Sequence, residues 1–132
     1  MCFSATASFA VGASLLGPGY YAIKRTKPRR MLAFASTPIV FSFHQIAEGF
    51  LWLSLKNPDF ASWYKPALYS YSFISQPFWP IWVPLIMWLM ETDKSRKKIL
   101  LYFFFLFGVT SLYIFYFLIN YDISAVSENC HI

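Results

Sequence analysis

Four long apolar runs constrain what this chain can fold into more than any other feature of its sequence. A helix needs roughly 20 apolar residues to cross the hydrocarbon core of a bilayer. Runs of about that length cover residues 3–23, 31–55, 67–90 and 99–119. Because 58% of the 132 residues are hydrophobic and 13% are charged, the chain has more apolar surface than a small soluble core buries. We expect an all-α polytopic membrane protein with four transmembrane helices, folded as one domain over residues 1–132.

The basic residues predict how these helices are oriented. All eleven Lys and Arg residues lie outside the four runs, and nine of them lie in two loops, residues 24–30 and 91–98. The positive-inside rule places both loops in the cytoplasm, which leaves both termini on the outer, non-cytoplasmic side. Clustered Lys and Arg also bind phosphates. A seven-residue loop between two spans has little room for a nucleic-acid module, so we expect the lipid bilayer as a partner and no nucleic acid.

A group of polar side chains interrupts the second run. The stretch FHQIAEGFLW, residues 43–52, contains His44, Gln45 and Glu48, and their spacing places all three on one face of a helix. A carboxylate inside a bilayer is costly, so it usually faces the bundle interior and marks a paired or functional site. At 1.5 Å per residue, Ser8 of the first run and Gln76 of the third lie at a similar depth. These five residues form the predicted intramembrane polar site.

Two interpretations of this polar site stay open. In the first, a neutral Glu48 bonds a serine or glutamine of another helix as part of a hydrogen-bond network. In the second, His44 and Glu48 bind one metal ion or exchange a proton. Two ligands are too few for a closed metal site, and His131, with Cys130 beside it, is the candidate for the missing ligand. A single metal ion is the one cofactor that these residues suggest, and their pattern is not the H-E-x-x-H motif.

The two cysteines, Cys2 and Cys130, both fall on the outer face in this topology, where oxidation is feasible. One hypothesis is a Cys2–Cys130 disulfide that closes the bundle. A second is that Cys130 and His131 complete the metal site. A third is that both thiols are unpaired and have no role.

Small residues and prolines predict how the helices pack. Ser4, Ser8 and Gly12 share one face of the first run, which favours close approach of another helix. The third run is expected to be kinked or broken near its middle, because three prolines each remove a backbone donor. These prolines are Pro77, Pro80 and Pro84.

The opening MCFSATASF, residues 1–9, together with HQIAEGFLWL, residues 44–53, resembles a family of uncharacterised, mainly bacterial multi-pass membrane proteins. Members begin with nearly this string and carry a Q-x-x-E-G-x-x-W element in the second helix, matched here by Gln45, Glu48, Gly49 and Trp52. The resemblance implies the bacterial cytoplasmic (inner) membrane and no assigned activity. Longer members continue with further helices after an element that resembles residues 130–132, so we expect a short variant or a truncated product.

Two classes of function follow from these observations. The preferred one is an accessory or structural subunit that packs in a larger membrane assembly, with other membrane subunits or further copies of itself as partners. Four helices with one polar cluster offer little internal cavity, which favours this class. The alternative is a small membrane enzyme, metal-binding protein or transporter that uses His44 and Glu48. The sequence does not decide whether the protein is an enzyme.

Overall fold

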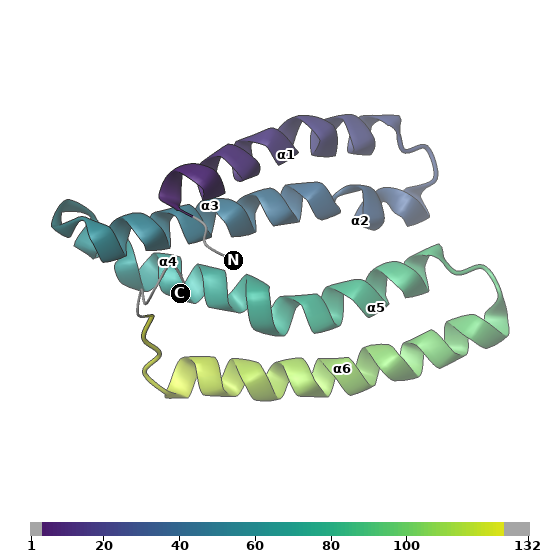
Figure 1. The fold of residues 1–132 in the computed structure, drawn as a ribbon. Coiled ribbons are helices and arrows are strands. Elements are labelled where there is room, and N and C mark those ends of the chain that lie inside the picture. Colours follow the sequence, from purple (N-terminus) through teal and green to yellow (C-terminus); the bar gives the residue numbers. More distant parts are fainter. Residues whose placement is uncertain (1–3, 126–132) are drawn as a thin grey trace.

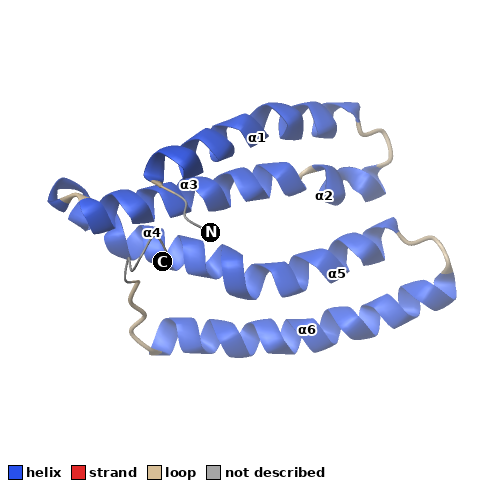
Figure 2. Cartoon of the chain, in the orientation of Figure 1, coloured by secondary structure: helices blue, strands red, loops and turns tan. Residues whose placement is uncertain are grey.

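The computed structural model describes residues 4–125, and these residues form helices connected by short loops (Figures 1 and 2). The all-α class and the four long helical segments are confirmed. The segments are α1 (Ala5–Arg25), α3 (Thr37–Lys56), the run from α4 (Tyr64–Phe73) to α5 (Trp79–Met90), and α6 (Lys94–Asn120). They make two antiparallel hairpins, and the two clusters of basic residues lie at the same end of the bundle (Figure 1). The predicted loop of residues 91–98 is shorter than expected, because α6 begins at Lys94 and its basic residues lie in the first turns of that helix.

The second apolar run is divided rather than continuous. After the 3₁₀ turn η1 (Arg29–Met31), the short helix α2 (Leu32–Ala35) ends at Ser36, and α3 begins at Thr37. Pro38, near the start of α3, has no N–H to donate, so the helical ladder cannot run through unchanged. The Ser36 hydroxyl instead donates to the Ala33 carbonyl over 2.8 Å. The result is an offset between α2 and α3.

Glycines bring α1 and α3 into close contact. A Cβ atom at Gly12 would lie 3.2 Å from the backbone oxygen of Ser42, and one at Gly19 would lie 2.6 Å from the side chain of Ile39. The buried Ser42 hydroxyl donates to the Gly12 carbonyl over 2.7 Å. The predicted packing of the small-residue face of the first helix is therefore confirmed at Gly12.

The third helical segment is bent but not broken. It runs from the 3₁₀ turn η2 (Pro58–Trp63) through α4, a five-residue π-helical segment η3 (Ile74–Phe78) and α5. Figure 1 shows the change of direction between α4 and α5. Proline and π-helical segments are both known causes of such bends. The Ser111 hydroxyl of α6 donates to the Pro77 carbonyl over 2.7 Å, so a neighbouring helix supplies a hydroxyl to this segment.

The turn between α5 and α6 is held by carboxylates. Asp93 caps α6 by accepting from the Arg96 amide at 2.9 Å. Glu91 accepts from the amides of Thr92 and Asp93 at 2.8 and 2.9 Å and pairs with the Arg96 guanidinium at 3.2 Å. The two amide donors, with help from Arg96, hold the pKa of Glu91 below its ordinary value.

At the opposite end, the chain after α6 returns to the start of α4. The Ala125 amide donates to the Tyr64 hydroxyl over 2.8 Å. Ile123 and Ala125 pack against a small core formed by Leu51 of α3 with Ala67 and Leu68 of α4.

Two segments of residues 4–125 are long and apolar enough to cross a membrane: Pro58–Met90 and Lys94–Asn120. Only 17% and 6% of their most apolar windows are buried, whereas the core helix of a soluble protein is mostly buried. α1 and α3, which the sequence also predicts as spans, do not meet the same criterion, because serines, glycines and polar residues replace large apolar ones.

Candidate functional site

The candidate site is one face of α3. His44, Gln45, Glu48 and Trp52 lie along this face, between the side that contacts α1 and the side that contacts α4. Glu48 is 9% exposed and Trp52 is 2% exposed. The structure therefore buries a carboxyl group and an indole one helical turn apart on the same helix.

Two contacts hold the centre of this face. The Gln45 side-chain amide donates to Glu48 Oε2 over 2.9 Å, a bond within one helix rather than between two. The His44 ring stacks on the ring of Tyr71 from α4, with centroids 4.9 Å apart and planes 15° from parallel. At the C-terminal end of the face, Lys56 Nζ lies 5.0 Å from the centroid of the Trp52 ring. An aromatic stack and a cation–π contact thus lie toward the two ends of this face.

α1 brings Ser8 to the same level of the bundle. The helices are antiparallel, and a Cβ at Gly12 would contact Gln45 and Ile46, while one at Gly49 would contact Phe9. Ser8, fully buried, therefore lies over the stretch of α3 that follows Gln45. A small side chain is needed there because the helix backbones approach closely.

Gln76, the fifth predicted member, is not brought to this face. It is exposed on η3, and no hydrogen bond joins it to the other four within residues 4–125. Tyr71, by contrast, stacks on His44 although it is not among the five residues that the sequence predicts for the site. A contact between two helices leaves no spacing signal within either one, so sequence reasoning had no means of finding it.

Several polar atoms of this face are buried without a hydrogen-bond partner in the described part of the chain. They are Ser8 Oγ, both ring nitrogens of His44, Gln45 Oε1 and Trp52 Nε1. Each such atom costs about 1–3 kcal/mol when left unpaired, and buried polar groups in folded proteins nearly always have a partner. The set includes donors and acceptors. Its chemistry suits a polar molecule, an ion or an exchangeable proton.

Only part of the predicted metal site lies within the described residues. Within residues 4–125, no group of three or more His, Cys, Asp and Glu residues is placed to hold a metal ion. His44 and Glu48 supply two candidate ligands. His131, Cys130 and Cys2 lie outside the described residues, so the third ligand and the Cys2–Cys130 disulfide both stay predictions.

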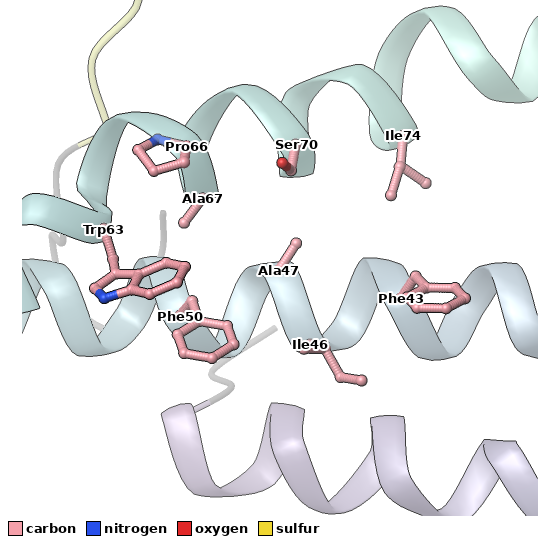
Figure 3. A pocket seen from close by; sticks show the side chains of 9 residues that line it. All are labelled: Phe43, Ile46, Ala47, Phe50, Trp63, Pro66, Ala67, Ser70 and Ile74. Atoms are coloured by element: carbon pink, nitrogen blue, oxygen red, sulfur yellow. The ribbon is translucent and has the colours of Figure 1, made fainter.

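The other side of the α3–α4 seam is an apolar groove (Figure 3). Its volume is about 340 Å³, and the rings of Phe50 and Trp63 stack at one end of it, 5.3 Å apart. Ala47 and Ala67 form its floor, and Ser70 carries its one hydroxyl. Such a lining suits an apolar chain rather than a polar ligand, which leaves the face of Glu48 as the candidate site.

Comparisons with known proteins give a family but no activity. No curated protein and no solved structure matched the chain. A family model described as a family of unknown function, DUF6629, matches residues 1–128. The match includes α1 to α6 and therefore the whole candidate site. The chain belongs to the DUF6629 family.

Proposed function

We propose that this protein is an integral membrane protein with four spanning helices, and that it serves as a helical subunit of a larger membrane assembly. The observation that carries the proposal is the surface of α6. Of its 27 residues, only Ser111 and Leu118 are buried. Large apolar side chains are exposed along its length: Ile99, Leu101, Tyr102, Phe103, Phe105, Leu106, Phe107, Val109, Leu112, Tyr113, Phe115, Tyr116, Phe117 and Ile119.

A surface of this kind supports a membrane location. Contiguous apolar patches on soluble monomers rarely exceed a few hundred Å², whereas lipid tails cover an apolar helix at no cost. The other helices are long enough to cross the same bilayer, since α1 and α3 have 21 and 20 residues and would each span about 30 Å. With both clusters of basic residues at one end, the positive-inside rule favours a cytoplasmic position for that end, in a bacterial inner membrane, and an outer position for both termini.

The subunit role is supported by how little of α6 the rest of the chain covers. α6 contacts α5, η3 and a short part of α4, all from one side. The uncovered sides are rich in Phe and Tyr, which are enriched at protein interfaces. The buried serine that anchors α6 lies on the covered side. The remaining surface is free to receive helices of other subunits.

Native mass spectrometry of the chain, extracted gently from its own membrane, tests the proposal. We expect a complex of fixed stoichiometry. Replacing Phe105 and Leu112 on the uncovered side of α6 with alanine should release the partner, whereas the same change at Phe43, exposed on α3, should not. A chain that stays monomeric and carries only lipid would contradict the subunit role.

A second candidate function is favoured by the polar atoms around Glu48 that have no hydrogen-bond partner within residues 4–125. In this alternative the chain is a small membrane enzyme, metal-binding protein or transporter. Glu48 accepts a proton or binds a cation, and His44, Gln45, Trp52 and Ser8 position the ligand by hydrogen bonds. The same native spectra distinguish the two roles. One metal ion or small molecule per chain, lost in Glu48→Gln but kept in Gln76→Glu, would favour the site.

A further inference from the structure

We propose that the basic end of the bundle binds an anionic phospholipid, with Arg29 and Arg30 on its phosphate and an acyl chain in the groove between α2 and α5. This inference rests on the membrane location given under the proposed function and does not depend on a partner subunit. It concerns the opposite end of the molecule from Glu48.

The groove has the lining that an acyl chain requires. Its volume is about 330 Å³, and it is bounded by Phe34 and Thr37 on one side and by the side chains of α5 on the other. The Thr37 hydroxyl turns back to the Ala33 carbonyl at 3.5 Å, which leaves an apolar wall. The α5 residues are Trp79, Trp82, Val83, Ile86, Met87 and Met90.

The break at Ser36 shapes this region. Because α2 is offset from α3, Phe34 stands between two grooves rather than inside a continuous helix face. The second groove, of about 450 Å³, also includes Phe34 and Thr37 and extends toward Leu15 and Ala22 of α1. Two apolar grooves that share a wall match the two acyl chains of one phospholipid.

Positive charge lies next to these grooves. The turn η1, which carries Arg29 and Arg30, packs against α5, and Met90, the last residue of α5, lines the first groove. Lys97 covers the Trp88 ring at 4.4 Å on another side of the α5 end. The nearby carboxylates of Glu91 and Asp93 face Arg96, and within residues 4–125 neither Arg29 nor Arg30 forms an ion pair.

Charge complementarity selects the occupant. Arginine guanidinium groups bind phosphate oxygens in a two-point geometry, and basic pockets between membrane helices bind anionic headgroups. Charge alone would accept any phosphate. An apolar groove that opens beside the arginines favours a phosphate that carries acyl chains. The proposed occupant is therefore a phospholipid from the membrane leaflet on the side of Arg29 and Arg30.

Tryptophan quenching tests the proposal, because Trp79 and Trp82 line the groove. The protein is reconstituted into phosphatidylcholine vesicles in which a fixed fraction of lipid is either brominated phosphatidylglycerol or brominated phosphatidylcholine. Bromine on the acyl chain quenches a nearby indole. We expect stronger quenching by the brominated phosphatidylglycerol.

Two variants and a matched control separate the contribution of the arginine charges to lipid binding from that of the groove. Arg29→Gln with Arg30→Gln should reduce the preference for phosphatidylglycerol by roughly 30-fold, which corresponds to about 2 kcal/mol. Val83→Phe should reduce quenching by filling the groove while it leaves the charge intact. Lys56→Gln with Lys65→Gln removes the same charge at the opposite end and should leave the preference unchanged.

The outcomes also separate this site from the membrane location itself. Absence of quenching by either lipid would contradict the membrane location. Equal quenching by both lipids would overturn the phospholipid site alone. A preference that survives the double arginine variant, or that disappears equally in the double lysine control, would overturn it as well. A preference unaffected by Val83→Phe would contradict the groove as the acyl-chain position.

Discussion

The two helical hairpins are built on different packing principles. In the hairpin of α1 and α3, Gly12, Gly19 and Gly49 stand where a Cβ would meet atoms of the other helix within 3.0 Å. In the hairpin of α5 and α6, Gly108 has nothing within 4 Å of such a Cβ. Glycine in an apolar run therefore brings helices together only where a neighbouring helix lies on its side. The seam of α5 and α6 instead depends on the hydroxyl of Ser111.

The hairpins also differ in what they bury. The first buries Ser8, Ser42 and Glu48, whereas Ser111 is the buried polar residue of α6. Only the second hairpin, with its longer and more apolar helices, meets the membrane-span criterion within residues 4–125. Helices that carry packing faces and polar groups therefore have lower hydropathy than helices whose apolar side chains are mostly exposed.

The largest expected effect is on the glycine seam. Gly12→Leu should destabilise the protein by roughly 3 kcal/mol, since overpacking a close contact shifts backbone and side chains. The same substitution at Gly108 should be neutral or stabilise by up to about 1 kcal/mol, because leucine is the better helix former. Unfolding in mixed micelles, followed by circular dichroism, measures both. Equal stability of the two variants would mean that the hairpins do not differ in this way.

The buried carboxyl group of the first hairpin comes next. Glu48→Ala leaves the buried Gln45 amide without its acceptor, so we expect the free energy of unfolding to fall by about 2 kcal/mol. Tyr113→Ala removes a ring of α6 that is 64% exposed and should cost under about 1 kcal/mol. Glu48→Gln, which keeps an acceptor oxygen, should fall between them. The same unfolding assay tests the order, and a Tyr113 variant as unstable as the Glu48 variant would argue against an interior, bonded Glu48.

The hydroxyl of the second hairpin should have a smaller effect. Ser111→Ala removes a buried bond to the Pro77 carbonyl and should cost about 1 kcal/mol. Thr110→Ala is the matched control, because Thr110 is exposed and bonds within its own helix, to Leu106. If both variants unfold at the same denaturant concentration, the Ser111 bond does not hold this hairpin together.

The smallest effect concerns the turns. The pKa of Glu91 is lowered in the folded state, so below its ordinary value of 4.5 the unfolded chain binds more protons at this residue than the folded chain does. Stability from Glu91 is therefore present above that pH and is lost as pH falls through the lower, folded pKa. Glu91→Gln should flatten this part of the curve of melting temperature against pH. Superimposable curves for the two proteins would contradict the role of the turn.

Much of the fold follows from local sequence signals. Long apolar runs between basic loops predicted four helices, and their order is as expected. The break at Ser36 was not predicted, although Pro38 carried the signal, because a proline is also tolerated in the first turn of a helix. The bend near Pro77 was predicted, but its form, a π-helical segment that accepts a hydrogen bond from α6, was not.

The candidate site was predicted in part. Helical spacing alone places His44, Gln45 and Glu48 on one face. Depth placed Ser8 and Gln76 in one layer, whereas in the structure Ser8 is buried and Gln76 is exposed on η3. Depth gives the position of a residue along the helix axis and not the direction of its side chain. Tyr71 joined the site through its stacking on His44, a contact between two helices.

By itself, the sequence determined the helical segments, their basic ends and the polar face of α3, because hydropathy, charge and helical spacing are local properties of the chain. Only the tertiary structure decided which glycines meet a neighbour, which polar atoms are buried without a partner in the described part of the chain, and where the offset of α2 opens a groove beside Arg29 and Arg30. These features depend on distances between helices that are far apart in the sequence, and no periodicity within one helix encodes them.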